Sequence, residues 1–473
     1  MKVLFAGAEA SPYIKVGGLG DVLGALPISL IKKGIDARVV LPLYSKIPNS
    51  LRENIKFVKS ISTTLGWRNI SFNIFESELN GIKYYLIDCE QYFKRPNVYG
   101  EYDDAERFAF FSKAILEILP HIDFYPDVLH ANDWHTAMIP VYLNAFYRNI
   151  EGYGAIKTVL TIHNIEFQGK YDPFILGDVF GLKEEDASIL MYDGCLNILK
   201  AGIESSDRVT TVSETYSKEI LTDYFSFGLN KILQEREYKL SGIVNGIDID
   251  LFNPKTDKYI SCNYDMSTLR FKSIDKKSLQ KSLGLAEDAK IPIISMVTRL
   301  TPQKGLDLVR EVMPEIMELD IQFVILGTGH REYEEFTRQW EHNAENKFRG
   351  IIAFSTEIAS RVYAGSDLFL MPSKSEPCGL AQMISMRYGT IPIVHTVGGL
   401  KDTVTPFNSE DKTGNGITFN SYNAHDMLDA IKRALSLYND KESYKQIRKN
   451  AMNTDFSWDV SADKYIDLYN GIG

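Results

Sequence analysis

The sequence has 473 residues, of which 44% are hydrophobic and 24% are charged, and its formal net charge is −10. The composition is ordinary for a folded globular protein. The length exceeds the roughly 250–300 residues at which a single hydrophobic core usually stops growing, so we expect two domains. The acidic balance argues against nucleic acid or an anionic membrane surface as the main partner. No run approaches the about 20 apolar residues of a membrane span.

The cysteine pattern indicates the redox environment. Cys89, Cys195, Cys262 and Cys378 lie far apart and form no C-x-x-C pair. This pattern suits a reducing compartment and predicts neither a disulfide framework nor a zinc site. The N-terminal apolar run is too short for a signal peptide and predicts a buried strand. We therefore expect a cytoplasmic protein, or a plastid protein if the chain is from a plant and already processed.

The first half of the chain alternates short apolar runs with segments of helical spacing, such as 105–119. This alternation indicates a parallel sheet with helices on both faces. Longer polar–apolar runs over 61–89 predict an inserted hairpin. The predicted strands are 2–8, 37–42, 83–88, 127–133, 157–164 and 208–213.

The second half repeats the alternation after a polar, lysine-rich stretch at 253–290. The two α/β units should meet near 240–255, and the segment 457–472 predicts a helix with Ser457 as its N-cap. The predicted strands are 291–299, 321–329, 350–354, 368–373, 391–397 and 416–420. Because open α/β sheets bind ligands beyond the carboxyl ends of their strands, we expect the functional motifs at strand-to-helix turns.

The first such turn is Lys15-Val16-Gly17-Gly18-Leu19-Gly20-Asp21, which follows the first strand. Glycines let a backbone approach a ligand closely, and a helix N-terminus attracts an anion. The spacing matches neither G-x-G-x-x-G nor the Walker motif, so a simple glycine-rich turn remains an alternative.

Two further turns lie in the second unit. Arg299 and Lys304 flank the turn after its first strand, where a guanidinium and an ammonium can hold one pair of phosphates. Glu376 follows the strand 368–373 and can accept hydrogen bonds from sugar hydroxyls, or it can instead cap a helix. Gly379 and Leu380 are predicted backbone N–H donors at the start of the next helix. Cys378 is predicted to be a packed residue, because no base stands beside it in the sequence.

Polar residues also follow two strands of the first unit. Asp133 comes directly before Trp134 and His135, and His163 ends the next strand. Asn245 stands in a predicted hinge turn. No H-E-x-x-H motif is present, and the D-x-D letters at 248–250 fall at the junction, so no metal site is predicted.

Taken in order, these motifs resemble one family closely. K-x-G-G-L-G-D-V, D-W-H, T-x-H-N, V-N-G-I-D, T-R-L-T-x-Q-K-G, P-S-x-x-E-P-C-G-L and G-G-L-x-D-T-V are similar to those of bacterial glycogen synthases and plant starch synthases. The resemblance runs from residue 2 to about 460. It implies a GT-B fold, in which two Rossmann-like doubly wound α/β domains face each other across a deep cleft.

The resemblance implies domains at 1–244 on the acceptor side and 245–456 on the donor side, with a helix at 457–473 crossing back to the first domain. It implies a retaining transfer of glucose from ADP-glucose to the 4-hydroxyl of a non-reducing α-1,4-glucan end, without a metal or other cofactor. The implied partners are a nucleotide-sugar donor and an α-glucan acceptor, with no nucleic acid and no membrane. The oligomeric state cannot be inferred.

The family's site residues carry over by position. The implied catalytic residues are Arg299, Lys304, Glu376 and His163. The implied substrate-binding residues are Lys15, Gly17, Gly18, Asp21, Asp133, Asn245, Phe354, Cys378, Gly379 and Leu380. Arg299 and Lys304 should hold the diphosphate, Glu376 the glucose, and Phe354 the adenine by stacking.

The sequence departs from the family pattern at three positions. Val16 replaces the usual Thr, Phe354 stands where Tyr is common, and Ser375 replaces an aromatic residue. Three alternatives remain open: the same transfer from UDP-glucose, a glucan phosphorylase, and a glucan-binding protein without activity. A phosphorylase would need a lysine motif for pyridoxal phosphate, and an inactive protein should have lost Lys15, Arg299, Lys304 or Glu376.

Overall fold

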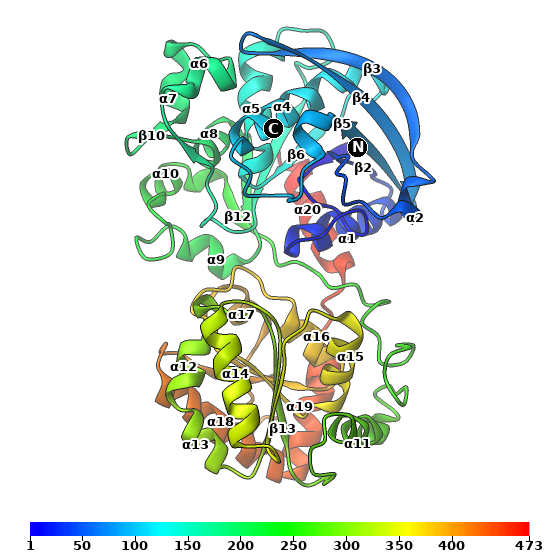
Figure 1. Ribbon diagram of the computed structural model, residues 1–473, viewed down its shortest axis with the longest axis vertical. Coiled ribbons are helices and arrows are strands. Elements are labelled where there is room, and N and C mark those ends of the chain that lie inside the picture. Colours follow the sequence, from blue (N-terminus) through cyan, green and yellow to red (C-terminus); the bar gives the residue numbers. More distant parts are fainter. Residues whose placement is uncertain (473) are drawn as a thin grey trace. The chain divides into compact units, whose positions relative to one another are not determined.

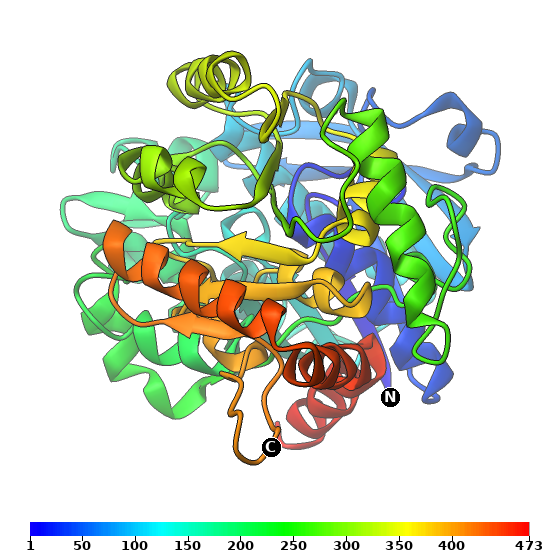
Figure 2. The ribbon, with the colours of Figure 1, turned by 90° about the horizontal axis from the view of Figure 1, so that it is seen from below.

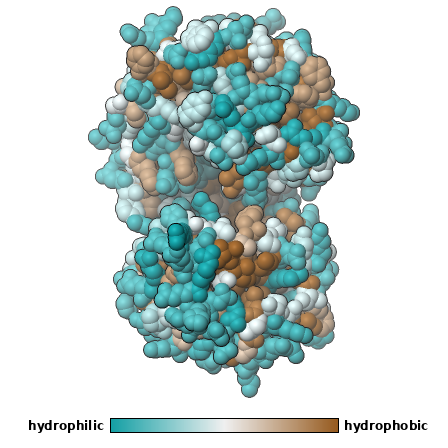
Figure 3. All heavy atoms as spheres, viewed as in Figure 1, coloured by the Kyte–Doolittle hydropathy of each residue, from teal (hydrophilic) through white to brown (hydrophobic). Residues whose placement is uncertain are grey.

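The computed structural model describes residues 1–472, which divide into two compact units (Figure 1). Unit 1 comprises Met1–Gly246 together with the C-terminal segment from Trp458, and unit 2 comprises Ile247–Ser457. Polar residues cover most of the visible surface of each unit, and hydrophobic residues gather in smaller groups (Figure 3). Within the described residues, no helix is long and apolar enough to cross a membrane.

Unit 1 is built on a nine-stranded sheet in the order β12-β11-β7-β6-β1-β2-β5-β4-β3. Seven neighbouring strands, from β12 to β5, run parallel, and β4 and β3 complete the sheet as antiparallel strands. The strands are β1 Lys2–Ala6, β2 Asp36–Pro42, β3 Lys56–Leu65, β4 Arg68–Leu79, β5 Ile82–Asp88, β6 Val128–Asn132, β7 Lys157–Ile162, β11 Arg208–Thr211 and β12 Leu240–Gly242.

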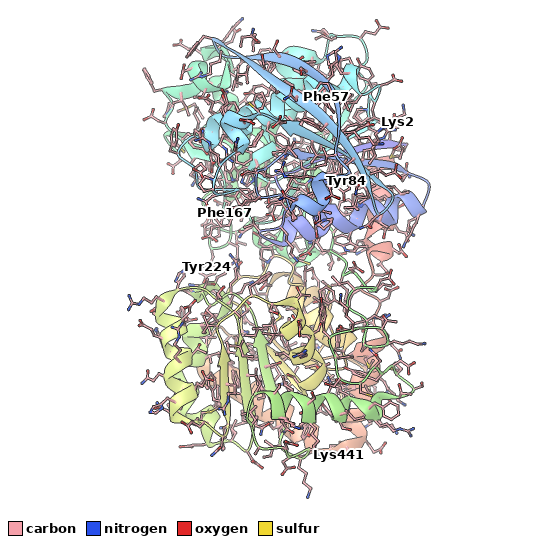
Figure 4. The ribbon with its side chains drawn as sticks, turned by 45° about the vertical axis from the view of Figure 1, so that its right-hand side comes forward. Lys2, Phe57, Tyr84, Phe167, Tyr224 and Lys441 are labelled. Atoms are coloured by element: carbon pink, nitrogen blue, oxygen red, sulfur yellow. The ribbon has the colours of Figure 1, made fainter. Side chains whose placement is uncertain are left out.

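The parallel strands form where the sequence has continuous apolar runs, because both faces of this part of the sheet are covered. The predicted hairpin is confirmed as β3 and β4, although it begins at Lys56 rather than near 61. Its first strand is largely exposed, as Phe57 illustrates, whereas Tyr84 of β5 is buried (Figure 4). A second, three-stranded sheet was not predicted, and it consists of β8 Lys170–Tyr171, β9 Met191–Tyr192 and β10 Cys195–Asn197.

The helices of unit 1 bury apolar faces against the large sheet. The predicted helix 105–119 is confirmed as α4, which buries all three of its phenylalanines. The last helix, α20, packs against α1, and Tyr469 places its hydroxyl 2.7 Å from Nδ1 of the buried His130. The helices are α1 Gly18–Lys32, α2 Asn49–Arg52, α3 Glu90–Phe93, α4 Asp104–Ile118, α5 Met138–Tyr142, α6 Ile175–Phe180, α7 Ala187–Leu190, α8 Ile198–Ser205, α9 Glu214–Glu219, α10 Asn230–Glu235 and α20 Trp458–Asn470.

Unit 2 is a six-stranded, wholly parallel sheet in the order β15-β14-β13-β16-β17-β18. All six predicted strands are present. They are β13 Ile293–Val297, β14 Gln322–Leu326, β15 Phe348–Ile351, β16 Leu368–Met371, β17 Ile391–His395 and β18 Ile417–Phe419.

Helices cover both faces of this sheet, and α18 packs along β17 and β18 (Figure 2). The polar stretch 253–290 contains α11 and no strand within the described residues. The helices are α11 Lys272–Ser282, α12 Leu306–Glu311, α13 Met313–Glu318, α14 Arg331–Asn343, α15 Thr356–Gly365, α16 Ala381–Arg387, α17 Gly398–Thr403, α18 Ala424–Asn439 and α19 Lys441–Asn453.

Both sheets reverse their strand order beside the first strand. In unit 2 the order is the 3-2-1-4-5-6 of dinucleotide-binding folds, with the reversal between β13 and β16. The parallel strands of unit 1 follow the same order with one strand added, and the reversal lies between β1 and β6. Ligands of such sheets bind at the reversal, beyond the carboxyl ends of the strands. Ligand-binding residues are therefore expected in the loops after β1, β6, β13 and β16.

Candidate functional site

In unit 2, Lys304 and Glu376 come together from the two loops at the sheet reversal. The ammonium nitrogen of Lys304, which follows β13, lies 2.5 Å from a carboxylate oxygen of Glu376, which follows β16. Both side chains are largely buried, with 14% and 8% of their surfaces exposed. Ser373 also donates a hydrogen bond to Glu376 over 3.0 Å. No side chain caps the start of the following helix at Ala381. The Glu376 carboxylate pairs with Lys304 instead, and this pairing leaves donors of the ammonium available to a ligand.

Close backbone contact holds these two loops in place. Gly305 has φ +75°, and a Cβ there would lie 2.1 Å from the carbonyl oxygen of Pro372. The amide of Lys374 donates a hydrogen bond to the carbonyl of Gln303 over 2.9 Å. A larger residue at 305 would push the loops apart, so the glycine of the T-R-L-T-x-Q-K-G motif sets the position of Lys304.

Arg299 occupies the same turn as Lys304 but is exposed. The hydroxyl of Thr301, between them, is buried and has no hydrogen-bond partner among the described residues. The turn therefore offers an accessible guanidinium and an unused hydroxyl at the carboxyl end of β13. Phe354, which lies between β15 and α15, has 88% of its surface exposed and presents an open aromatic face.

The turn after β16 differs from the expectation in one respect. Helix α16 begins at Ala381, not at Gly379, because Gly379 adopts a left-handed conformation with φ +74°. Gln382 fixes this turn by donating to the carbonyls of Cys378 and Gly379 at 3.2 and 2.8 Å. Leu380 is the helix N-cap. Cys378 is 5% exposed, as predicted for a packed residue.

In unit 1, the glycine-rich loop is organised by Glu9. The buried carboxylate of Glu9 accepts hydrogen bonds from the amides of Val16 and Gly17, at 2.5 and 2.8 Å, and from the hydroxyl of Tyr99 at 2.8 Å. Helix α1 then begins at Gly18. The loop is therefore anchored from within, and two of its amides already donate to Glu9.

Lys15, Gly17 and Gly18 of this loop are exposed, whereas Leu19 and Gly20 are buried. Lys15 pairs with Asp21 over 2.6 Å while 42% and 30% of their side-chain surfaces stay exposed. A Cβ at Gly18 would meet no described atom within 4 Å, and one at Gly17 would meet only a Glu9 oxygen at 3.6 Å. Packing within the chain therefore does not require glycine at these two positions, and close approach of a ligand is the remaining physical reason for it.

Asp133 and His163 also meet, at the ends of β6 and β7. The amide of His163 donates to the Asp133 carboxylate over 2.7 Å. Burial raises the pKa of Asp133 to about 7, although amides of His163 and Asn164 oppose the rise. Asp133 has φ +56°, a strained conformation for a residue with a side chain. A carboxyl group with this pKa can exist in either protonation state near neutral pH.

His163 is neutral near pH 7, because burial lowers its pKa to about 3. The amide nitrogen of Asn132 donates to the carbonyls of Ala6 and His130, so its oxygen faces His163. Nε2 of His163 must then carry the proton that it donates to this oxygen over 2.9 Å. The imidazole is thus an oriented neutral group with Nδ1 as its lone-pair nitrogen.

The other polar candidates of unit 1 are buried. Asn245 is 6% exposed, and its side-chain oxygen has no hydrogen-bond partner among the described residues. Trp134 and His135 are both buried, and their ring centres are 4.2 Å apart, so that pair supports the loop by packing.

Four residues that organise these loops were missed: Glu9, Tyr99, Asn132 and Ser373. A glutamate directly after the apolar run KVLFAGA could have been noticed, since charges rarely follow a buried strand without a partner. Tyr99 and Ser373 carry no such signal in the sequence. Within residues 1–472, no group of three or more His, Cys, Asp or Glu side chains is arranged to hold a metal ion.

Comparison with known proteins matches each unit to a glycosyltransferase family model. Residues 2–235 match the family described as starch synthase catalytic domain, and residues 275–454 match glycosyl transferases group 1. A glycogen synthase of Bacillus cereus is 51% identical over 474 residues, with all of both chains covered. One from Lactobacillus acidophilus is 48% identical over 471 residues, covering 99% of each.

Two solved structures match this chain over nearly its full length. The catalytic domain of starch synthase IV from Arabidopsis thaliana, bound to ADP and acarbose, matches 100% of this chain and 99% of its own with a TM-score of 0.92 and 33% identity. A sucrose-phosphate synthase from Thermosynechococcus elongatus shares the fold, with a TM-score of 0.63, 17% identity, and 99% and 98% of the chains covered. The predicted GT-B fold is confirmed. The chain belongs to the glycogen synthase and starch synthase family of glycosyltransferases, the enzymes that build α-glucans.

Proposed function

We propose that the protein transfers the glucosyl group of ADP-glucose to the 4-hydroxyl at the non-reducing end of an α-1,4-glucan, with retention of configuration. The observation that carries this proposal is the buried Lys304–Glu376 pair at the sheet reversal of unit 2, beside the exposed Arg299. The ADP and acarbose bound to the Arabidopsis starch synthase support the donor and acceptor classes.

In this proposal unit 2 binds the donor through fixed charges. Arg299 and Lys304 hold the diphosphate and stabilise the negative charge that develops on the departing ADP. Glu376 already holds Lys304 in position before the donor binds, and it accepts hydrogen bonds from hydroxyls of the transferred glucose. The amides of Gly379 and Leu380 are donors to sugar or phosphate oxygens, next to the buried Cys378. Phe354 stacks on the adenine.

Unit 1 contributes mainly neutral and weakly charged groups. Gly17 and Gly18 let the backbone approach the donor, and Lys15 adds a positive charge that Asp21 orients. His163 is proposed to lie near the anomeric carbon as a neutral hydrogen-bonding group, since its low pKa excludes an imidazolium at neutral pH. Asp133 and Asn245 are proposed to contact sugar hydroxyls, because each has hydrogen-bonding capacity to offer.

The proposed transfer occurs on one face of the sugar. The bond between C1 and the β-phosphate oxygen breaks as the acceptor O4 bonds to C1 from the same side. The O4 proton passes to the departing phosphate oxygen, so ADP leaves without need of a second protein carboxylate. The cationic side chains carry the charge stabilisation in this scheme, and we propose that no metal takes part. The four cysteines are free thiols, which suits the cytoplasm as the proposed location.

The test is incorporation of radiolabelled glucose into a glycogen primer, from ADP-glucose and from UDP-glucose, with EDTA present. Incorporation from ADP-glucose that EDTA does not reduce is the expected result. Incorporation from UDP-glucose alone would overturn the donor, and suppression by EDTA would overturn the absence of a metal. A folded protein that transfers from neither donor would instead be a glucan-binding protein without activity.

A further inference from the structure

The loop that carries Glu376 is fastened by the neighbouring strand β17. His395, the last residue of this strand, places Nδ1 2.8 Å from the carbonyl oxygen of Ser373. Because a carbonyl oxygen can only accept, Nδ1 carries the proton and donates it. Gly399, four residues later, donates its amide hydrogen to the carbonyl of Glu376 over 3.0 Å. The stretch 373–376 is therefore held at both of its ends by the segment that begins at the end of β17.

Ser373 transmits this constraint to the Glu376 carboxylate. The serine hydroxyl donates to one carboxylate oxygen over 3.0 Å, and the same oxygen accepts from the Lys304 ammonium. His395 is only 8% exposed, so its bond to Ser373 has little competition from water. A continuous series of contacts thus runs from the imidazole, through the serine and the carboxylate, to the ammonium.

Tyr422 holds the other loop, which carries Lys304. It stands between β18 and α18, and its hydroxyl donates to the carboxylate of Asp307 over 2.6 Å. Asp307 lies in the first turn of α12, three residues after Lys304. The same hydroxyl lies 3.4 Å from the carbonyl oxygen of Pro302, two residues before Lys304. Tyr422 therefore contacts this loop on both sides of the lysine.

The rings of His395 and Tyr422 pack against each other, so the two constraints are joined. Their centres are 5.5 Å apart, and the ring of Phe419 lies 5.4 Å from His395. Nε2 of His395 also lies 3.3 Å from the carbonyl oxygen of Asn420. Aromatic rings at such distances attract each other beyond the area that they bury. One packed group at the ends of β17 and β18 therefore contacts the Lys304 loop and the Glu376 loop together.

We propose that His395 and Tyr422 are positioning residues for the transfer, which keep the loops of the Lys304–Glu376 pair at one fixed separation. This inference rests on the proposed function for the identity of the reaction. An ammonium stabilises a developing charge most effectively when it is already in place before the reaction begins. A displacement of about 1 Å can reduce a rate about 100-fold. Neither residue stands in the sequence motifs by which the chain resembles its family.

The experiment is steady-state transfer from ADP-glucose to glycogen by single variants of the intact protein. We expect kcat to fall about 10- to 100-fold in His395→Phe and about 3- to 10-fold in Tyr422→Phe, with KM for ADP-glucose changed less than about threefold. His395→Asn should restore most of kcat, because its amide N–H can replace Nδ1–H as the donor to Ser373. Tyr444→Phe is the matched control, since the buried hydroxyl of Tyr444 donates to the carbonyl of Asp367 over 3.0 Å. Asp367 precedes β16, at the end of the strand opposite to Glu376, so this variant should lower Tm and leave kcat unchanged.

Unchanged kcat in both His395→Phe and Tyr422→Phe, or an equal loss in Tyr444→Phe, would overturn the positioning role. Failure of His395→Asn to restore kcat would overturn the link through Ser373, because the shape of the ring would then be the cause.

A cycle of Tm measurements tests the same link without activity. The losses of Tm in His395→Phe and Glu376→Gln should not add in the double variant, whereas those of Tyr444→Phe and Glu376→Gln should add. Additive losses in both pairs would overturn the proposal. A coupled first pair in a protein that transfers no glucose would contradict the proposed function and leave the positioning of Glu376 by His395 standing.

Discussion

The two units share a strand order but present different chemistry beyond the carboxyl ends of their strands. In unit 2, the loops after β13 and β16 carry permanent charges, namely Arg299 and the Lys304–Glu376 pair. In unit 1, the loops after β6 and β7 carry a neutral His163 and an Asp133 whose pKa is raised to about 7. Burial favours the neutral forms of His163 and Asp133 in unit 1, whereas Lys304 and Glu376 of unit 2 lie against each other as an ion pair.

The difference shows how two units of one architecture can take separate roles in a transfer reaction, one towards the diphosphate and the other towards the sugar. A diphosphate leaving group requires fixed positive charge that is already in place. A sugar hydroxyl requires hydrogen-bonding groups that do not attract competing ions. If this division is real, changes in unit 2 should reduce the rate regardless of pH, and changes in unit 1 should act through hydrogen bonding and protonation.

The largest effect is expected at the charged pair of unit 2. Lys304→Ala and Glu376→Ala should each lower kcat by on the order of 10²-fold or more, because a transition-state contact is lost. The measurement is steady-state transfer from ADP-glucose to glycogen. Near-normal turnover in a folded Lys304→Ala protein would contradict the role of this residue.

A double variant separates chemistry from folding at this pair. Removing one partner leaves a buried charge uncompensated, which typically costs about 3–5 kcal/mol of stability. Lys304→Met combined with Glu376→Gln removes both charges and should recover most of the lost Tm. Activity should stay low in the double variant, since the positive charge is still absent. Recovery of activity together with Tm would mean that the pair is only structural.

The catalytic role of Arg299 can be tested without a large change in the unfolding free energy. Its side chain is exposed, so Arg299→Ala should change the unfolding free energy by no more than about 0.5 kcal/mol. Loss of a charge-assisted contact to the diphosphate should lower kcat/KM by about 10- to 100-fold and weaken inhibition by ADP. Arg331→Ala is the matched control, because that arginine of α14 has 89% of its side chain exposed. Equal effects in both variants would contradict the diphosphate-binding role of Arg299.

The sequence predicts the helices and strands better than it predicts the contacts between side chains. Every central strand was predicted, because a strand buried on both faces must be a continuous apolar run. Strand β3 was predicted to begin too late, since its sequence KFVKSISTTL lies at an exposed edge and lacks that pattern. The strands β8, β9 and β10 have only two or three residues each, too few to show any periodicity.

Single site residues were predicted better than their contacts. Lys304 and Glu376 were each singled out by position, but 72 residues separate them and nothing local indicates their ion pair. Tyr99 bonds to Glu9 across 90 residues and carries no local signal either. The pKa of Asp133 depends on burial within unit 1, which only the assembled fold creates. The start of α16 was misplaced because the left-handed conformation of Gly379 delays the helix.

The pH dependence of stability tests the proposed role of protonation in unit 1. Asp133 has a folded-state pKa of about 7, above the about 3.9 of an unfolded chain. Its contribution to stability is therefore present below about pH 4 and is lost as pH rises through about 7. Asp133→Asn should remove this dependence, which can be measured as the difference in Tm between the two proteins from pH 5 to 8.

The same titration should appear in the acceptor kinetics. We expect kcat/KM for glycogen in the parent enzyme to change by up to about tenfold between pH 6 and 8, and the inflection near pH 7 should be absent in Asp133→Asn. Lys304→Arg, a variant of unit 2, should keep the inflection. An unchanged inflection in Asp133→Asn would assign it to another group and would weaken the proposed division between the units.

The smallest effect is expected at Phe354, where unit 2 is proposed to bind without charge. Stacking of an exposed ring on adenine contributes about 0.5–1.5 kcal/mol, so Phe354→Ala should raise KM for ADP-glucose by about two- to tenfold and leave kcat nearly unchanged. Phe354→Tyr keeps the ring and should match the parent enzyme. A fall in kcat with constant KM would mean that the ring acts in the transition state rather than in donor binding. The charged residues would then not account for all of the catalysis in unit 2, and the comparison would need to include this aromatic contact.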